Sequence, residues 1–323
     1  MEKRVKLSIL MPAYNTAPFI AEAIESILTQ TYTNFELLIA DDASTDDTFE
    51  IARAFLEKDI RIKIFKHPDN LGFVGNKNFL LQQASGDYIA WQDSDDISYP
   101  ERIKVQMDAI TTFNVEIVAT NLNRIRNVED NWVEEKKNKS SDCSYLIKEP
   151  VSNYPFMFAT LLFSRKVLDA SGCFNQYFNG LLGEDFYWTM KANTVFPIYY
   201  IDQILYGYRV NYNSTTNTFN ERKLIMPVVL NKLFTQYEST HTDWLEQEKY
   251  EDIRVFENQL LNDRKHMSEQ YRIWSAKAVD SGDFVRAKIF LIKAFIAWPL
   301  NVKSLRTGFY YLRILSKKYL INI

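Results

Sequence analysis

The stretch YIAWQDSDDISYP, residues 88–100, decides the fold, because an apolar run ends there abruptly in a cluster of acids. Asp93, Asp95 and Asp96 occupy three of four consecutive positions. Crowded carboxylates repel one another, and this raises their pKa values unless a cation or hydrogen-bond donors compensate. Such a cluster at the end of a buried strand indicates a binding or catalytic site.

The chain before residue 120 alternates between apolar, β-branched runs and amphipathic runs, which is the pattern of βαβ units around a parallel sheet. Strands are predicted at residues 5–11, 35–40, 61–65 and 87–92. Helices are predicted between them, at residues 18–30, 46–58 and 75–84. The acidic stretch therefore follows the fourth strand of an α/β domain.

The pattern changes after residue 150. Residues 155–172 predict a strand running into a short helix, and residues 180–193 predict a helix after a glycine turn. Further strands are predicted within residues 196–210, and from about residue 217 the apolar spacing is helical. We expect a Rossmann-like α/β domain over residues 1–215, with a mostly parallel central sheet flanked by helices. A helical C-terminal extension is expected over residues 216–323.

Composition disfavours several classes of protein. The formal charge of −3 argues against a nucleic-acid binder, and two cysteines, Cys143 and Cys173, are too few for a disulfide framework. Three histidines are scattered singly, which argues against zinc. No run reaches about 18 apolar residues, the length that a membrane-spanning helix needs. We therefore expect a protein of the reducing cytoplasm.

The charge is uneven near the C-terminus. After Asp283 there is no acidic residue, while eight residues are basic: Arg286, Lys288, Lys293, Lys303, Arg306, Arg313, Lys317 and Lys318. Aromatic residues are interleaved with them, as in helices that lie on anionic lipid. A solvated face on a packed helical tail has the same pattern. Peripheral contact with the inner face of the plasma membrane is thus one of two interpretations.

Polar residues lie where the predicted strands end. Pro12, Tyr14 and Asn15 stand at the end of the first strand, and Asp41 and Asp42 follow the second. In open α/β sheets, ligands bind beyond the carboxyl ends of the strands. These residues and the acidic stretch are therefore expected at one edge of the sheet.

Helix capping is the alternative explanation for acids in such places. We accept it for residues 44–46, which precede the second helix, but it leaves Asp41 and Asp42 without a capping task. One acid of DSDD caps the next helix in this interpretation, yet three acids are more than a cap uses. The pair Glu184–Asp185, before a predicted helix, has the same alternative.

The spacing of Asp93 and Asp95 suits a divalent cation. Mg²⁺ and Mn²⁺ prefer oxygen ligands, and phosphate oxygens complete the shell that one or two carboxylates begin. There is no G-x-G-x-x-G after the first strand and no G-x-x-x-x-G-K-[ST] loop. A diphosphate held here must therefore be neutralised by metal and basic side chains instead of a glycine-rich loop.

Five segments together resemble a known family. They are SILMPAYN (8–15), QTYTNFELLIADDASTDDT (30–48), DNLGFVGNKN (69–78), GDYIAWQDSDDISYPERI (86–103) and GEDFYW (183–188). In this order and spacing they resemble the inverting family 2 glycosyltransferases of the GT-A fold, over about residues 5–215. The resemblance implies transfer of a sugar from a nucleotide sugar, most commonly a UDP-sugar, to a saccharide or lipid-linked acceptor. Bacterial members commonly build surface polysaccharides such as capsule.

The resemblance also implies roles for residues of the donor site. Tyr14 would stack on the nucleobase, and Asp42 would accept the pyrimidine N3–H. Lys77 would lie near the diphosphate, Asp93 would hold the ribose or a metal-bound water, and Asp95 would ligate Mn²⁺ or Mg²⁺. The metal assignment covers both Asp95 and Asp93. Further donor-site residues are expected to be Pro12, Asn15 and Arg209.

The base is expected in GEDFYW. Asp185 would take the proton of the acceptor hydroxyl, with Glu184 contacting the acceptor or exchanging roles with it. Asp96 is expected to order the loop. The sequence departs from the family at Asn211, where members often have a histidine, so Arg209 and Ser214 remain as possible phosphate contacts.

Two other functions compete with this hypothesis. A sugar nucleotidyltransferase also uses metal-bound carboxylates, but it requires an N-terminal glycine-rich loop with Arg and Lys, which MPAYNTAPF (11–19) lacks. A non-catalytic carbohydrate-binding or scaffold subunit could retain the sheet. The presence of Asp93, Asp95 and Asp185 argues against the scaffold without excluding it.

Overall fold

A computed structural model describes residues 7–128, 131–134, 143–210, 220–280 and 282–320. The chain divides into two compact units, residues 1–211 and 212–323. The sequence placed the boundary between residues 215 and 216, and this position lies outside the described residues. Each unit is considered by itself.

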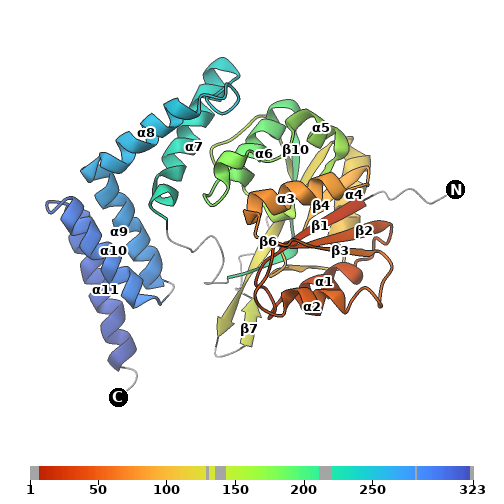
Figure 1. Cartoon of the computed structure of the whole chain (residues 1–323), viewed down its shortest axis with the longest axis horizontal. Coiled ribbons are helices and arrows are strands. Elements are labelled where there is room, and N and C mark those ends of the chain that lie inside the picture. Colours follow the sequence, from red (N-terminus) through yellow and green to blue (C-terminus); the bar gives the residue numbers. More distant parts are fainter. Residues whose placement is uncertain (1–6, 129–130, 135–142, 211–219, 281, 321–323) are drawn as a thin grey trace. The chain divides into compact units, whose positions relative to one another are not determined.

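The first unit is built on one mixed sheet with the strand order β3-β2-β1-β4-β9-β6-β10-β5 (Figure 1). Two further strands extend it, with β7 paired to β6 and β8 paired to β10. The strands are β1 Leu7–Ala13, β2 Phe35–Asp41, β3 Ile62–Lys66, β4 Tyr88–Trp91, β5 Ile97–Ser98, β6 Ile117–Val128, β7 Asn131–Glu134, β8 Tyr145–Ile147, β9 Leu162–Ser164 and β10 Ile198–Arg209.

Strand direction explains why one edge collects the polar residues. The strands β3, β2, β1 and β4 are all parallel. The short strand β9 is antiparallel to both β4 and β6, and β6 is parallel to β10, so β4, β6 and β10 all run the same way. Their carboxyl ends therefore share one edge, as expected for ligand binding in such sheets.

Helices cover the sheet of the first unit. They are α1 Ile20–Leu28, α2 Thr48–Arg53, α3 Gly72–Gln83, α4 Arg102–Phe113, α5 Arg165–Ser171 and α6 Glu184–Val195, with 3₁₀ turns at Phe158–Thr160 and Gln176–Phe178. Leu7, Ile9 and Met11 of β1 share one core cluster with residues of α1, α2 and α4. Helix α3 contacts β1 and β2. Because β1 is almost entirely buried, its sequence is continuously apolar, as is usual for a central parallel strand.

The second unit is helical, as its sequence predicts. Its described helices are α7 Glu221–Thr240, α8 Tyr250–Asn262, α9 Arg264–Asp280, α10 Phe284–Ala297 and α11 Val302–Leu320. Helix α9 packs on both α10 and α11, and α10 also contacts α11. Ala278, Val279 and Ala287 form a small core between these helices. Among the described helices, none combines the length and the hydropathy that a bilayer crossing requires.

The predicted elements of the first unit are largely confirmed, with two differences. Helix α2 ends at Arg53, although the apolar spacing predicted a helix to residue 58, and residues 54–58 form turns instead. Residues 196–210 were predicted to hold several strands, but they form the single long strand β10. Its register shifts near Ile204 where it pairs with β6, so an irregularity replaces the expected break.

Candidate active site

The acidic turn lies between β4 and β5 and is fixed by hydrogen bonds from behind. The amide of Asp93 donates to the Tyr206 hydroxyl at 3.2 Å. The side chain of Gln92 donates to the carbonyls of Asp93 at 3.0 Å and of Asp96 at 3.1 Å. The backbone of the turn is therefore held in one conformation. Helix α4, which follows, has Glu101 as its N-cap and no side-chain cap.

Asp96 is the structural member of the turn. It is fully buried, and its Oδ1 accepts the amide proton of Arg209 at 2.8 Å. Burial, and then the charges of Asp95 and Asp93, raise the pKa of Asp96 well above its usual value. This bond ties the turn to the end of β10, so the expectation that Asp96 orders the loop is confirmed.

Asp93 and Asp95 are the members of the turn that remain partly exposed. Burial and the neighbouring charge of Asp95 raise the pKa of Asp93 to about 7, against the opposing effect of Lys77. Two carboxylates that repel each other are a donor set that fits Mg²⁺ or Mn²⁺. Within the described residues, no group of three His, Cys, Asp or Glu is placed to hold a metal ion. A cation here would therefore need phosphate oxygens and water to complete its shell.

The second carboxylate pair begins helix α6. The helix is preceded by Gly183, whose φ of 108° is a left-handed conformation that favours glycine. Glu184 and Asp185 form the first turn of the helix and do not cap it with their side chains. The Asp185 side chain is 41% exposed, whereas that of Glu184 is 8% exposed. Asp185 is thus the member of the pair that a ligand can reach.

Lys77 of α3 joins these carboxylates. Its Nζ lies 2.6 Å from Oδ1 of Asp185 and 2.9 Å from Oε1 of Glu184. Burial lowers the pKa of the Lys77 ammonium, but the charges of Asp185, Glu184 and Asp93 outweigh burial and raise this pKa above its usual value. The Lys77 ammonium therefore stays charged. Its charge acts on Asp93 of the acidic turn and on the two carboxylates at the start of α6.

Aromatic rings enclose the Lys77 ammonium. Its Nζ lies 5.2 Å from the ring centroid of Phe174, 5.3 Å from that of Phe158 and 6.0 Å from those of Phe73 and Trp91. Ring faces attract a cation, most strongly when it is desolvated. The rings and the two carboxylates together hold Lys77 in one place. The resemblance put Lys77 near the diphosphate, whereas in this structure it contacts protein carboxylates.

Glu184 is affected by the same cluster. Burial, and then the charge of Asp185, raise the pKa of Glu184 to about 7, with Lys77 acting in the opposite direction. A carboxyl group with such a pKa changes its protonation near neutral pH. Glu184 and Asp185 therefore occupy different environments, one buried and one accessible, although they are adjacent in sequence.

The loops after β1 and β2 are tied to each other. Asn15, in a left-handed conformation, accepts the amide proton of Thr45 on its Oδ1 at 2.8 Å, and its own amide donates to Ser44. Tyr14 is 44% exposed beside this tie, and Pro12 lies within β1. These two hydrogen bonds hold the loop that carries Tyr14, the residue predicted to stack on the nucleobase.

Asp41 and Asp42 both accept backbone amide protons, although neither caps the helix α2 that follows them in the chain. Oδ2 of Asp41 accepts the amide proton of Ser44 at 3.1 Å. Oδ1 of Asp42 accepts the amide proton of Leu71 at 2.7 Å, just before α3 begins. Both acids satisfy backbone amides of the turns that follow the strands. Asp42 nevertheless ends up beside the start of α3, which carries Lys77.

Arg209 lies at the end of β10 and is buried, with 2% of its surface exposed. Its Nη1 donates to the Asp95 carbonyl at 3.1 Å, and its Nη2 pairs with Glu22 of α1. These contacts place Arg209 behind the acidic turn. Asn211 and Ser214, which the sequence analysis discussed with it, lie outside the described residues.

Sequence reasoning missed Arg102, which lies fully buried at the start of α4. Its guanidinium donates to the carbonyls of Trp91 at 2.9 Å and Ala159 at 2.7 Å, and to the Ser98 hydroxyl at 2.8 Å. Burial lowers the pKa of Arg102 to about 10, although Tyr206 and the acids of the turn oppose this. Arg102 belongs to the segment PERI (100–103), close behind the acids. This position was the sequence feature that could have indicated its role.

A mostly parallel sheet with an acidic turn after β4 and a carboxylate pair at the start of α6 is the arrangement of a GT-A type of fold. Residues 8–185 match the family model described as Glycosyl transferase family 2. The chain belongs to this family.

Curated relatives of bacterial origin agree with the family. The chain is 44% identical over 108 residues to "Putative glycosyltransferase EpsE" of Bacillus subtilis, a match covering 33% of this chain and 39% of that protein. It is 38% identical over 121 residues to "UDP-Glc:alpha-D-GlcNAc-diphosphoundecaprenol beta-1,3-glucosyltransferase WfgD" of Escherichia coli, covering 38% of this chain and 47% of the relative. The matches therefore span less than half the length of these relatives.

Solved structures share the fold at low sequence identity. S. aureus TarS 1-349 in complex with UDP-GlcNAc has a TM-score of 0.56 and 18% identity, covering 90% of this chain and 91% of that one. The mannosyltransferase PcManGT from Pyrobaculum calidifontis, in complex with GDP-Man and Mn²⁺, has a TM-score of 0.55 and 16% identity, covering 99% and 88%. These likenesses concern the architecture alone.

Proposed function

We propose that this protein is an inverting glycosyltransferase that moves a sugar from a UDP-sugar to a saccharide or lipid-linked acceptor during synthesis of a cell-surface polysaccharide. One observation carries the proposal: Lys77 contacts Glu184 and Asp185 while its field also acts on Asp93. The charge of Lys77 therefore acts both on the acidic turn, which is proposed to bind the donor, and on Asp185, which is proposed to act on the acceptor. Residues 1–215 hold the catalytic domain in this proposal.

The donor side uses the turn between β4 and β5. Asp95 and Asp93 would hold Mn²⁺ or Mg²⁺, and the bound ion would supply charge neutralisation for the diphosphate. Tyr14 stacks on the base and Asp42 receives the pyrimidine N3–H, with Pro12, Asn15 and Arg209 shaping the donor pocket. Arg209 and Asp96 keep the turn in place through the bonds described above. TarS binds UDP-GlcNAc and PcManGT binds GDP-Man with Mn²⁺, which supports a nucleotide-sugar donor of this kind.

The acceptor side uses Asp185. The acceptor hydroxyl gives its proton to the Asp185 carboxylate while its oxygen forms a bond to the donor's C1. The bond between C1 and the diphosphate oxygen breaks, and the electron pair leaves with the nucleoside diphosphate. Lys77 orients both carboxylates of the pair, and the buried Glu184 acts by holding the Lys77 ammonium in place. Attack from the face opposite to the leaving group inverts the anomeric configuration.

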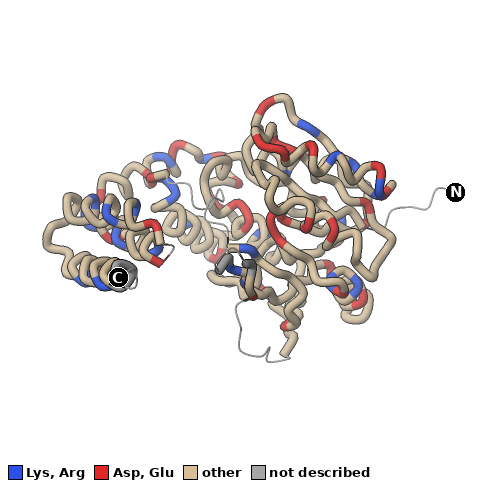
Figure 2. The backbone as a smooth tube through the Cα atoms, turned by 90° about the horizontal axis from the view of Figure 1, so that it is seen from below, with Lys and Arg blue, Asp and Glu red and all other residues tan. Residues whose placement is uncertain are grey.

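We also propose peripheral attachment of residues 284–323 to an anionic membrane surface, consistent with a lipid-linked acceptor. The absence of acidic residues after Asp283 and the eight basic ones support this. Figure 2 shows Lys and Arg along the helix that leads to the C-terminus. The name of the relative WfgD, which includes a diphosphoundecaprenol, supports a lipid-linked acceptor.

A panel of nucleotide sugars tests the proposed activity. Each donor is incubated with the protein and Mn²⁺, with or without candidate saccharide acceptors, and released nucleoside diphosphate is measured. We expect release from a UDP-sugar that depends on metal, and a product whose anomeric configuration, read by NMR coupling constants, is opposite to that of the donor. Release of pyrophosphate would replace this proposal with nucleotidyl transfer, and failure of every donor to bind would favour a scaffold.

A further inference from the structure

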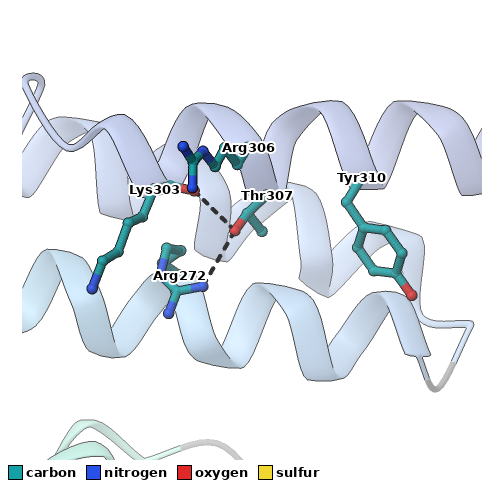
Figure 3. A pocket seen from close by; sticks show the side chains of 5 residues that line it. All are labelled: Arg272, Lys303, Arg306, Thr307 and Tyr310. Carbon is teal, nitrogen blue, oxygen red and sulfur yellow. Dashed lines mark hydrogen bonds between the residues drawn. The ribbon is translucent and has the colours of Figure 1, made fainter.

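The helical unit contains a hollow that the transfer reaction does not use. It lies between α9 and α11, has a volume of about 400 Å³, and is lined by Arg272, Lys303, Arg306, Thr307 and Tyr310 (Figure 3). The side chains come from one face of each helix, so the hollow is formed within this unit. No part of it depends on the α/β unit.

Positive charge exceeds negative charge around this hollow. Glu269 takes two bonds from Arg272, at 2.9 and 2.6 Å from Nε and Nη2, and lies 3.6 Å from Lys303. Arg306 is exposed, and among the described residues it has no hydrogen-bond or ion-pair partner. One carboxylate thus faces three cations at this end of the hollow.

The polar groups of Thr307 and Tyr310 in the hollow already have hydrogen-bond partners. Tyr310 donates its hydroxyl proton to Asp280 at 2.6 Å, and Figure 3 shows this ring standing apart from the three basic side chains. The Thr307 hydroxyl donates to the Lys303 carbonyl and accepts from Nη1 of Arg272 at 3.5 Å. The surplus charge is therefore concentrated on Arg306 and Lys303, where an anion would complete the set. Guanidinium and ammonium groups match phosphate oxygens in geometry and charge.

An exposed apolar face borders the hollow on α11. Val302, Leu305, Phe309 and Leu312 follow one another at three- and four-residue spacing, and their exposed fractions run from 51% to 72%. Residues three or four apart are neighbours on a helix surface, so Arg306 stands between this face and the hollow, next to Phe309. Apolar exposure on this scale marks a contact with a partner or a membrane.

Helix α10 has an apolar stripe of its own. Its core-facing residues are Ala287, Phe290 and Ala294, and opposite them lies an exposed series with helical spacing: Val285, Ile289, Ile292 and Ile296. Lys288 lies exposed on one flank of this series, and Lys293 on the other flank pairs with Glu221 at 3.1 Å. A helix with aliphatic residues on one face and lysines at its borders suits a lipid–water interface, because the lysine stems lie along the apolar boundary while their charges reach the headgroups.

We propose that the hollow binds the phosphate of an anionic lipid headgroup while the apolar face of α11 enters the acyl boundary beside it. The proposal rests on the membrane attachment proposed above and adds a defined headgroup site to it. A second copy of residues 284–323 is a poor occupant, because this segment bears only basic charges and two such segments would repel each other. A bilayer with anionic headgroups offers negative charge to the basic residues of the hollow and an apolar interior to the exposed face of α11.

Vesicle flotation with the full chain tests this. The variant Lys303→Gln/Arg306→Gln removes two charges from the hollow, and Lys288→Gln/Arg313→Gln removes two exposed charges from the same unit outside it. All four positions are exposed, so both variants should fold like the parent. With vesicles containing phosphatidylglycerol at low salt, we expect the hollow pair to lower the partition coefficient at least about tenfold more than the matched pair.

A second comparison changes the chemistry of the headgroup. Vesicles of equal surface charge are made with oleate, which offers a carboxylate in place of a phosphate. The hollow pair and the matched pair should then differ by less than about twofold, because only the general attraction of the surface remains. Equal losses for both variants on phosphatidylglycerol would overturn the headgroup site. Absence of binding by the parent chain would overturn the attachment itself, whereas nucleotide release without vesicles tests the transferase activity separately.

Discussion

The ammonium of Lys77 lies 2.6 Å from Asp185 and 2.9 Å from Glu184, inside a ring of aromatic side chains. Helix α3 and helix α6 are thus joined at the point where the proposed base stands. A cation that stays charged in this place keeps two adjacent carboxylates from repelling each other. Its loss would leave buried charge without compensation, which is strongly unfavourable.

Replacing Lys77 with methionine should therefore affect catalysis more than donor binding. We expect Lys77→Met to lower kcat at least about 100-fold, since the geometry of the Asp185 carboxylate is lost. Lys77→Arg should restore part of the rate because it keeps the charge. The dissociation constant of UDP with Mn²⁺, measured by calorimetry, should change by less than about threefold. A large loss of UDP affinity with an unchanged kcat would instead assign Lys77 to the diphosphate.

Asp185→Asn should separate chemistry from binding. An amide cannot take the acceptor proton, so transfer should fall by about 10³-fold, within the usual contribution of a general base. UDP affinity should stay within about twofold, because Asp185 acts on the acceptor. Steady-state kinetics and calorimetry on the same preparation provide both values. Full transfer activity in this variant would remove Asp185 from the role of base.

Asp95→Asn should weaken metal-dependent binding. The amide keeps the shape of the side chain but loses the charge that a divalent cation requires. We expect UDP affinity in Mn²⁺ to fall at least about tenfold, with little change in EDTA. Asp108→Asn on α4 is the control, because that side chain is 63% exposed and pairs only with Lys104 among the described residues. Similar behaviour of both variants would contradict a metal role for Asp95.

Stability without ligands should fall as the pH rises toward 8. The pKa of Glu184 is raised to about 7 in the folded chain from a usual value of 4.5, so the folded state holds a proton that the unfolded state releases. The contribution of Glu184 to the free energy of unfolding is therefore fully present below pH 4.5. This contribution is lost progressively as the pH rises through about 7. Asp93, whose pKa is also raised to about 7, acts in the same direction.

Glu184→Gln isolates this effect. The variant cannot ionise, so its melting temperature relative to the parent should increase between pH 5 and pH 8 by a few degrees, measured by differential scanning fluorimetry. Glu50→Gln, at an exposed site on α2, should show no such trend. A constant difference between parent and Glu184→Gln across this range would show that Glu184 does not exchange its proton there.

Two glycines with positive φ offer a matched pair of variants. Gly183 before α6 and Gly172 after α5 have φ values of 108° and 72°, so alanine at either position should cost at least about 1–2 kcal/mol in the free energy of unfolding, and more at Gly172, whose ψ of −171° suits glycine alone. Only Gly183 sets the direction of Glu184 and Asp185. Gly183→Ala should therefore also lower kcat, whereas Gly172→Ala should leave it unchanged. Equal kcat values in the two variants would contradict this positioning.

The sequence predicted the α/β framework well because its strands are central and parallel. Residues 35–40 and 87–92 are apolar on both faces, so they could be recognised without knowledge of their neighbours. The short strand β9 was also recognised from residues 155–172, but nothing local revealed that it inserts antiparallel between β4 and β6. That arrangement depends on pairing between distant segments.

The candidate site was predicted in its parts and not in its connections. The acids of DSDD could be singled out from residue type and spacing, whereas those of GEDFYW were singled out through the family resemblance. The contact of Lys77 with Asp185 joins positions 108 residues apart, and no local pattern encodes it. Arg102 was missed for a similar reason, since its partners include the carbonyl of Ala159, 57 residues away. A buried arginine that satisfies backbone oxygens has no distinctive sequence signature.

The insertion of β9 divides the catalytic unit along its own chain. The chain completes the acidic turn by Ser98 and does not reach its second pair of acids until Glu184. The stretch between them is not a free insert, because Arg102 bonds the Trp91 carbonyl and the rings of Phe158 and Phe174 enclose Lys77. A change of length there is compatible with the site only in loops that leave these three side chains in place.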